Sequence, residues 1–231
     1  MLTSIITQTL STLGTNPRTV LLTLILATIL PPTTASLYFI WHVRSRPSRH
    51  HTALLLVLGD IGRSPRMMYH AESFAKRGWE TALVGYHETP LIPSLLELPH
   101  VHVFPISNPP KSLLKLPWVC RAPIRIIYQI VSVFKICLYT IPVHPAVILV
   151  QNPPSIPTLA LARLITHLSS SKLIIDWHNT GYSILAMRTG EASPLVRIAK
   201  WFEAKYGRVA YAHLFVTRAL QSFLTDEWKL Q

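Results

Sequence analysis

The stretch TALLLVLGDIGRSPRM, residues 52–67, indicates the fold class of this chain. It begins with an almost unbroken apolar run at residues 52–58, as expected of a parallel strand that is buried on both faces. A turn with two glycines follows, and Ser64 and Pro65 then have the pattern of a helix N-cap with proline at the first helical position. A buried strand that leads through a tight turn into a helix is typical of a doubly wound α/β fold.

The same alternation of strands and helices continues along the chain. Apolar runs predict further strands at residues 79–86, 101–106, 146–151, 172–177 and 213–217. Helices are predicted between them, at residues 64–78, 121–139, 156–168, 193–208 and from 218 onward. The sequence therefore predicts an α/β fold with a parallel, doubly wound, Rossmann-like sheet.

An uncharged apolar segment, residues 19–41, precedes this domain. A helix that spans a membrane needs about 20 predominantly apolar residues, so the segment is long enough. Pro31 and Pro32 would kink such a helix, which transmembrane helices tolerate. Tyr38 and Trp41 lie where interfacial aromatic residues are common. We therefore expect one N-terminal transmembrane helix.

The arginines around this segment predict its orientation. Arg44, Arg46 and Arg49 follow it, whereas only Arg18 precedes it. By the positive-inside rule, the C-terminal domain is expected in the cytosol. The rival interpretation, a cleaved signal peptide, lacks a charged n-region and a small-x-small cleavage site. The expected layout is a lumenal N-terminus at 1–18, the anchor at 19–41, a basic juxtamembrane segment at 42–51 and the α/β domain at 52–231.

The chain is strongly basic, with a formal net charge of +12. Such a charge favours anionic partners, namely nucleic acid, phosphorylated ligands or an anionic lipid surface. No Lys/Arg-rich block, zinc-ligand spacing or RNP-like motif is present in the sequence, so nucleic acid is not expected as a partner. No acidic residue occurs between Glu97 and Asp176, which favours membrane lipid or a phosphorylated ligand.

The segment at residues 111–141 mixes large apolar residues with cations. This pattern is typical of a helix at a membrane interface. Arg125 and Lys135 interrupt the apolar run and disfavour a second span. A core helix on the flank of the sheet explains the pattern equally well, because periodicity does not separate the two.

The two cysteines, Cys120 and Cys137, lie in apolar surroundings without a metal-like spacing. A disulfide between them is not expected in the reducing cytosol. Both are therefore interpreted as packing residues.

Residues 59–67, GDIGRSPRM, form the first candidate site because ligands bind at the carboxyl ends of the strands in such sheets. The glycines allow a tight turn, the helix N-terminus favours an anion, and the arginines can bind phosphate. The spacing is not G-x-G-x-x-G, so a dinucleotide is not indicated. The alternative is a glycine turn with two solvated arginines. The residues expected to bind phosphate or substrate are Gly59, Asp60, Gly62, Arg63, Ser64 and Arg66.

The second candidate site is DWHNTGYS, residues 176–183, at the end of the fifth predicted strand. His178 is the candidate general base, and Asp176 is its orienter or the alternative base. Asn179 is a candidate substrate contact. The alternative is an aromatic loop that packs on the core, with a histidine that only satisfies hydrogen bonds. No Asp-x-Asp motif occurs.

The third candidate site is QNPPSIPT, residues 151–158. Asn152 and Ser155 are candidate ligand contacts. The alternative is that the prolines only shape the turn.

Together these segments resemble the N-terminal half of the chitobiosyldiphosphodolichol beta-mannosyltransferases. The resemblance is carried by VLGDIGRSPRMMYHAESFAKRGW, QNPPSIPTLALA, KLIIDWHNTGYSILAM and KWFEAKYGRVAYAHLFVTRAL. It covers the chain from about Leu54 to its end, and GDIGRSPRM together with IDWHN is not a generic Rossmann pattern.

The resemblance implies a GT-B fold in the endoplasmic reticulum membrane, single-pass, with its catalytic part in the cytosol. It implies transfer of mannose from GDP-mannose, with inversion, to the chitobiose of dolichyl diphosphate. It also implies an enzyme that commonly needs no bound metal. Together with the absence of an Asp-x-Asp motif, this leads us to expect no metal or other cofactor. Other mannosyltransferases of the dolichol pathway are possible partners. A GT-B enzyme has two Rossmann-like domains, and this chain holds one. The chain is therefore expected to be an N-terminal fragment that transfers no mannose without a donor domain.

Two other functions remain open at this stage. The chain could be a non-catalytic, membrane-anchored subunit that recruits a separate donor-binding domain, and an exposed apolar face near the C-terminus would support this function. It could also be a membrane tether for phosphoinositides, which would need no cleft.

Protease protection tests the predicted topology. In sealed microsomes, a tag at the C-terminus should be digested without detergent, because the arginines after residues 19–41 keep that side in the cytosol. A tag at the N-terminus should be digested only after detergent is added. A protected C-terminal tag would refute this orientation.

Overall fold

The computed structural model describes the backbone of residues 17–110, 113 and 117–230. It also describes the side chains of these residues, except at positions 17–27, 30, 48–49, 118–120 and 122. The chain divides into two compact units, Met1–Ser45 and Arg46–Gln231.

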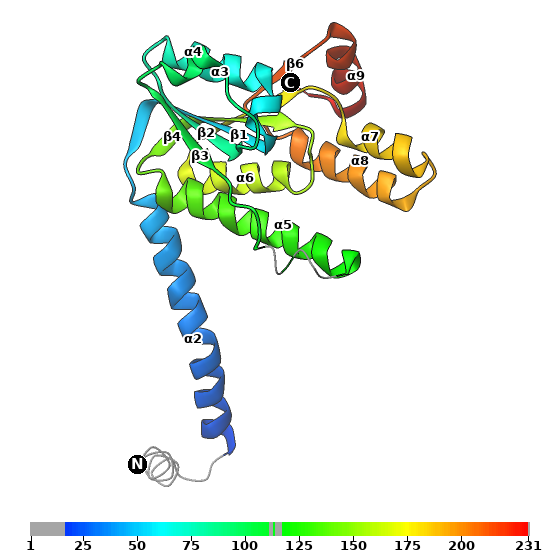
Figure 1. The fold of residues 1–231 in the computed structure, drawn as a ribbon. Coiled ribbons are helices and arrows are strands. Elements are labelled where there is room, and N and C mark those ends of the chain that lie inside the picture. Colours follow the sequence, from blue (N-terminus) through cyan, green and yellow to red (C-terminus); the bar gives the residue numbers. More distant parts are fainter. Residues whose placement is uncertain (1–16, 111–112, 114–116, 231) are drawn as a thin grey trace. The chain divides into compact units, whose positions relative to one another are not determined.

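The first unit contains helix α2, Pro17–Arg44, which includes the predicted anchor (Figure 1). The hydroxyls of Thr33, Thr34 and Ser36 each donate to a main-chain carbonyl of the same helix, at 2.9, 3.0 and 2.7 Å. Such internal bonds satisfy polar groups that hydrocarbon cannot. The helix is 28 residues long, which exceeds the about 20 residues that a membrane span needs.

The second unit is built on a six-stranded parallel sheet, which confirms the predicted α/β class. The strand order is β3-β2-β1-β4-β5-β6, the order of the doubly wound Rossmann arrangement. Strands β2 and β3 extend the sheet on one side of β1, and β4, β5 and β6 extend it on the other side. The topological switch point therefore lies between β1 and β4. The strands are β1 (Ser48–Asp60), β2 (Glu80–Tyr86), β3 (Val101–Pro105), β4 (His144–Asn152), β5 (Lys172–Trp177) and β6 (Ala212–Phe215).

Helices cover both faces of this sheet. Figure 1 shows α3 and α4 over one face and α5 and α6 over the other. The α7–α8 hairpin precedes β6, and α9 follows it. The helices are α3 (Pro65–Ala75), α4 (Pro93–Leu96), α5 (Trp118–Lys135), α6 (Thr158–Ser169), α7 (Gly181–Thr189), α8 (Pro194–Gly207) and α9 (Arg218–Trp228).

Strand β1 lies at the centre of the core because it pairs with β2 on one side and with β4 on the other. Leu55 and Val57 are almost fully buried, and they belong to the same apolar cluster as Met67 and Met68 of α3. The continuous apolar run of the sequence is thus explained by helices on both faces.

The start of α3 only partly follows the predicted cap. Ser64 is the N-cap residue and Pro65 follows it, as predicted. However, the Ser64 hydroxyl makes no capping bond and donates instead to the Asp60 carbonyl at 3.3 Å. At α8 the predicted N-cap is complete, because the Ser193 hydroxyl accepts a hydrogen bond from the Leu195 N–H at 3.3 Å.

Helix α5 confirms the predicted helix at residues 121–139, and the π-helical turn Ile136–Thr140 continues it. Ile127 and Val131 are about 60% and 59% exposed, whereas Val133 and Leu138 are buried. Among the residues that the structure describes, Pro123–Thr140 is long and apolar enough to cross a membrane, and 17% of it is buried.

Cys137 packs inside the domain as a free thiol, which confirms its predicted role. Burial raises the pKa of Cys137 to about 12, so the thiol stays protonated and unreactive. The side chain of Cys120 lies outside the described residues.

Candidate functional site

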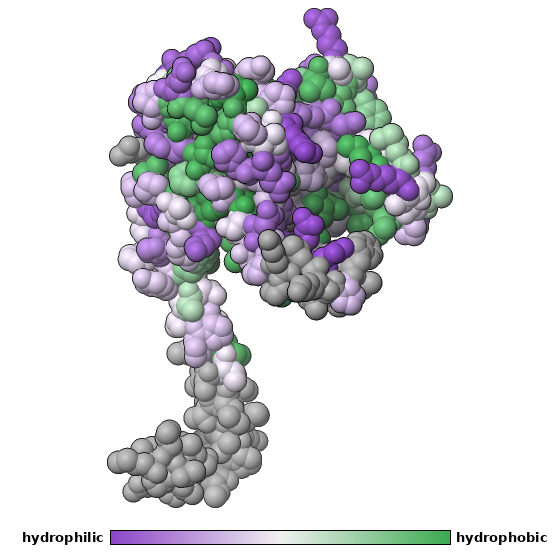
Figure 2. Space-filling model, in the orientation of Figure 1, coloured by the Kyte–Doolittle hydropathy of each residue, from purple (hydrophilic) through white to green (hydrophobic). Residues whose placement is uncertain are grey.

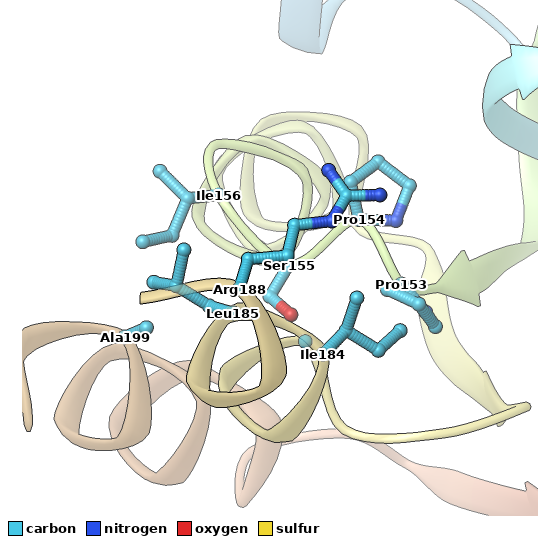
Figure 3. A pocket seen from close by; sticks show the side chains of 9 residues that line it. Pro153, Pro154, Ser155, Ile156, Ile184, Leu185, Arg188 and Ala199 are labelled. Carbon is cyan, nitrogen blue, oxygen red and sulfur yellow. The ribbon is translucent and has the colours of Figure 1, made fainter. Parts of the chain in front are cut away.

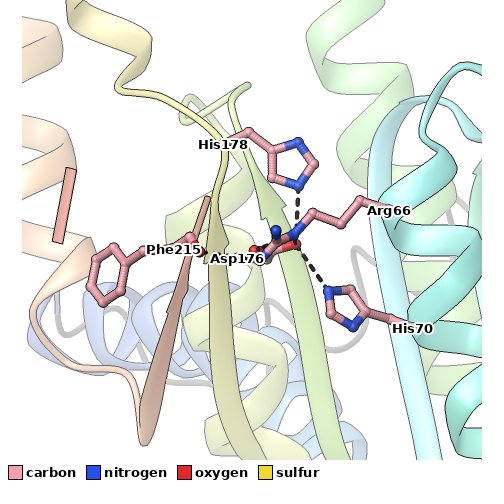
Figure 4. Close-up of polar contacts among 5 residues, drawn as sticks. All are labelled: Arg66, His70, Asp176, His178 and Phe215. Atoms are coloured by element: carbon pink, nitrogen blue, oxygen red, sulfur yellow. Dashed lines mark hydrogen bonds and ion pairs between the residues drawn. The ribbon is translucent and has the colours of Figure 1, made fainter. Parts of the chain in front are cut away.

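A buried carboxylate gathers three basic side chains at the carboxyl end of the sheet (Figure 4). Asp176, near the end of β5, is fully buried. Its Oδ2 lies 2.8 Å from Arg66 Nε, 3.0 Å from His178 Nε2 and 3.2 Å from His70 Nε2. Arg66 and His70 are one turn apart on α3, so their side chains share one face of that helix. One carboxylate thus joins α3 to the loop after β5.

The charge on Asp176 is maintained by these contacts. Burial by itself raises the pKa of Asp176. The hydrogen bonds from His178, His70 and Arg66 outweigh this effect and hold the pKa well below its usual value. Asp176 is therefore ionised at neutral pH, and a buried carboxylate surrounded by donors is poorly placed to accept a proton.

His70 and His178 each contact Asp176 through their Nε2 atom. Since an ionised carboxylate only accepts, each imidazole donates its Nε2–H to it. A neutral imidazole that donates from Nε2 carries its lone pair on Nδ1, the atom that can accept a proton. The side chains of His178 and His70 are 25% and 27% exposed, so both rings are partly open to solvent.

The Arg66 guanidinium is engaged within the protein. Its Nε contacts both oxygens of Asp176, at 2.8 and 3.1 Å, and its Nη2 donates to the Phe215 carbonyl at 3.4 Å. Arg66 therefore connects α3 to β5 and β6. The structure unites this arginine of the first predicted site with the acid and histidine of the second.

The rest of the first predicted site is held by Asp60. Its Oδ1 accepts from the N–H groups of Gly62, Glu88 and Thr89, at 3.3, 3.1 and 3.2 Å. The hydrogen bond from the Thr89 hydroxyl is the largest cause of the lowered pKa of Asp60. Asp60 thus joins the turn after β1 to the loop after β2.

The two glycines of this turn differ in what they require. A Cβ on Gly62 would lie 2.5 Å from the Thr89 carbonyl oxygen, so only glycine fits there. A Cβ on Gly59 would meet only the Val57 side chain, at 3.9 Å. Arg63 is 83% exposed and lies 3.5 Å from Asp60, which leaves a solvated cation at the rim of the site.

A second buried carboxylate, Glu203 of α8, holds the third predicted site. It accepts from Asn152 Nδ2 at 3.0 Å and from the Ser155 hydroxyl. It also accepts from the N–H groups of Gly181 and Tyr182, at 2.7 and 2.9 Å, which are the first residues of α7. Glu203 therefore occupies the helix N-terminus where an anionic ligand could otherwise bind.

This network reaches the candidate base through the main chain. The His178 N–H donates to the Asn152 carbonyl at 2.9 Å, and Asn152 Nδ2 also contacts the Asn179 carbonyl at 3.3 Å. The Asn179 side chain accepts from the Thr180 N–H at 2.8 Å. Asn152 and Asn179 thus support the loop that carries His178.

A separate cavity of about 270 Å³ lies between the turn after β4 and helix α7 (Figure 3). Apart from Ser155 and Arg188, its lining is apolar and includes Pro153, Ile156 and Ile184. Neither Asp176 nor His178 lines this cavity. Within the described part of the chain, no group of three or more His, Cys, Asp or Glu side chains could hold a metal ion.

Sequence reasoning missed His70 and Glu203, although each had a signal. His70 lies four residues after Arg66 on a predicted helix, which places the two on one face. Glu203 lies on the face of α8 that is buried at Val196, Ala199 and Gly207. An acid in a buried helical stripe needs hydrogen-bond donors, and this requirement could have been read from the sequence.

The substitution Glu203→Gln tests whether this carboxylate holds the loops. An amide nitrogen would face N–H donors, so at least one buried donor would lose its acceptor. The free energy of unfolding should fall by about 2 kcal/mol or more. It is measured by urea unfolding followed by tryptophan fluorescence.

The matched control is Glu227→Gln, since Glu227 is 40% exposed and forms an ion pair with Lys200. This change should cost about 1 kcal/mol or less. Equal losses for the two variants would contradict the role assigned to Glu203.

Curated proteins are similar to this chain over most of its length, although no family model matches it. The human chitobiosyldiphosphodolichol beta-mannosyltransferase is 37% identical over 188 residues, covering 81% of this chain and 39% of the relative. The protein of the same name from Yarrowia lipolytica is 40% identical over 168 residues, covering 71% of this chain and 35% of the relative. That from Dictyostelium discoideum is 34% identical, covering 77% of this chain and 38% of the relative.

These matches confirm the resemblance that the motifs indicated. The chain spans about two fifths of the length of the curated relatives it matches. Over most of its own length, it is similar to the chitobiosyldiphosphodolichol beta-mannosyltransferases.

Proposed function

We propose that this domain forms the acceptor side of an inverting mannosyltransferase. The reaction transfers mannose from GDP-mannose to the chitobiose of a dolichyl diphosphate acceptor. The likeness to named beta-mannosyltransferases supports the reaction class. The observation that carries the proposal is the cluster of Asp176 and His178 at the carboxyl end of the sheet, where doubly wound folds bind their ligands.

In this proposal His178 is the general base. Its Nδ1 takes the proton of the acceptor hydroxyl as the hydroxyl oxygen attacks the anomeric carbon of mannose. The bond from that carbon to the diphosphate of GDP breaks in the same displacement, which inverts the configuration. Asp176 accepts the Nε2–H and so orients the ring, and it stabilises the positive charge that His178 gains. Its lowered pKa supports this role over that of alternative base.

The turn after β1 is proposed to contact a diphosphate. Arg63, which is 83% exposed, supplies a solvated cation in this turn. Gly62 lets the turn pack closely against the loop after β2, and the N-terminus of α3 adds a favourable dipole. Arg66 holds Asp176, whose carboxylate balances its charge, so Arg63 is assigned the diphosphate contact.

The membrane is proposed to hold the domain beside its lipid acceptor. Helix α2 would be the single-pass anchor in the endoplasmic reticulum, with the α/β domain in the cytosol. The exposed Ile127 and Val131 of α5, together with Arg125 and Lys135, would contact an anionic lipid surface. Other mannosyltransferases of the dolichol pathway would be partners on the same membrane.

A second candidate function is supported by a different surface. Leu195, Ile198 and Trp201 of α8 are 57%, 56% and 57% exposed. Figure 2 shows apolar patches among the hydrophilic surface at the end of the domain where α7 and α8 lie. Such a face suits a non-catalytic subunit that recruits a separate donor-binding domain.

Activity measurements on one substitution separate these functions. The chain is fused to the part of the human relative that it does not match, and microsomes are supplied with GDP-mannose and the dolichyl diphosphate acceptor. His178→Ala should lower kcat by around 10²–10⁴-fold, because the general base is lost. The exposed His167 of α6 provides the control, and His167→Ala should retain the parental rate.

A rate for His178→Ala near that of the parent would exclude His178 as the base and favour the non-catalytic function. Thermal unfolding of each variant accompanies the rates, so that a loss of folding is not mistaken for a loss of chemistry.

A further inference from the structure

His70 contacts the same carboxylate oxygen as the candidate base. Its Nε2 lies 3.2 Å from Asp176 Oδ2, and His178 Nε2 lies 3.0 Å from that atom. Figure 4 shows the two rings on different sides of the carboxylate, one from α3 and one from the loop after β5. His70 therefore adds a hydrogen bond to Oδ2 without contacting His178 through any bond that the structure records.

The bonds around Asp176 are unevenly divided between its two oxygens. Oδ2 accepts from Arg66, His178 and His70, whereas Oδ1 accepts from Arg66 alone. Arg66 Nε contacts both oxygens, so by itself it does not decide which oxygen faces His178. A donor on α3 that binds only Oδ2 removes this freedom. His70 is that donor.

Charge gives a reason for an imidazole in this position. The carboxylate of Asp176 and the guanidinium of Arg66 already balance each other. A neutral donor fixes the carboxylate without adding a second positive charge, which would oppose the charge that His178 gains on accepting a proton. An imidazole can donate from Nε2 in its neutral form and so can meet this requirement, whereas a second arginine would always add a charge.

Resting on the proposed function, we propose that His70 is a positioning residue for the general base. It holds Asp176 Oδ2 toward His178 and so keeps His178 protonated on Nε2, with Nδ1 free. No bond to substrate is assigned to it. Loss of His70 should let the carboxylate turn, and His178 would then divide between two tautomers.

Magnetic resonance of nitrogen-labelled histidine tests this role without any activity measurement. The full chain is studied in detergent micelles, and the signal of His178 is identified by its absence in His178→Ala. The parent should show His178 protonated on Nε2 alone. His70→Ala should show a mixture of tautomers, whereas His70→Gln, whose amide can still donate to Asp176, should stay close to the parent. An unchanged His178 spectrum in His70→Ala would overturn the proposal.

Kinetics in the fused enzyme give a second, independent readout. His70→Ala should lower kcat by about ten-fold or more, the size expected for one lost hydrogen bond to a charged group, with KM for both substrates nearly unchanged. His70→Gln should recover most of the rate. In a His178→Ala background, His70→Ala should cost little more, because its effect passes through His178.

These outcomes distinguish a failure of the role assigned to His70 from a failure of the proposed function. A slow His178→Ala enzyme with a normal His70→Ala enzyme would overturn the role of His70 and leave the proposed function standing. A normal His178→Ala enzyme would overturn the base assignment, while the tautomer spectrum would still decide whether His70 positions Asp176. An equal loss from His70→Ala in both backgrounds would mark a purely structural residue.

Discussion

The buried carboxylate of Asp176 is the constraint on which the site depends. An isolated ionised carboxylate in the interior costs several kcal/mol, so its donors must be present in the folded state. Those donors come from α3 and from the loop after β5, and Arg66 also binds the end of β6. One strand, β4, lies between the origins of these segments, because α3 follows β1 and the loop that carries His178 follows β5. Satisfying one charge therefore fixes the carboxyl edge of the sheet.

Glu203 has the same role on the other side of the loop that carries His178. Among the described residues, no cation forms an ion pair with Glu203. Its carboxylate accepts hydrogen bonds from Asn152, Ser155 and the start of α7 instead. The two carboxylates hold this loop at both ends, since Asp176 binds the His178 ring and Glu203 binds the N–H groups of Gly181 and Tyr182. In the proposed mechanism, a base held in this way needs little reorganisation when it accepts a proton, which is the condition for efficient general base catalysis.

The sequence predicts the sheet well because its signal is local. Each buried parallel strand is an apolar run, and the strand at residues 172–177 has the predicted bounds. The contacts within the site were harder to predict from the sequence. Arg66 and Asp176 are 110 residues apart, and only the order of the strands in the sheet brings them together. Periodicity does not reveal that order. Asp60 shows the same limit, since three of its partners are main-chain N–H groups and the fourth, the Thr89 hydroxyl, lies 29 residues away in the loop after β2. His70 was within reach, as the i+4 neighbour of Arg66.

The most direct test of the proposed reaction is the linkage of the sugar that is transferred. Microsomes containing the fused enzyme are given labelled GDP-mannose and chitobiosyl dolichyl diphosphate, and the oligosaccharide is released and digested with linkage-specific mannosidases. In-line displacement with His178 as the base predicts a single mannose that β-mannosidase removes and α-mannosidase does not. A product cleaved by α-mannosidase would contradict inversion at this site, and with it the arrangement of base and acceptor proposed around Asp176.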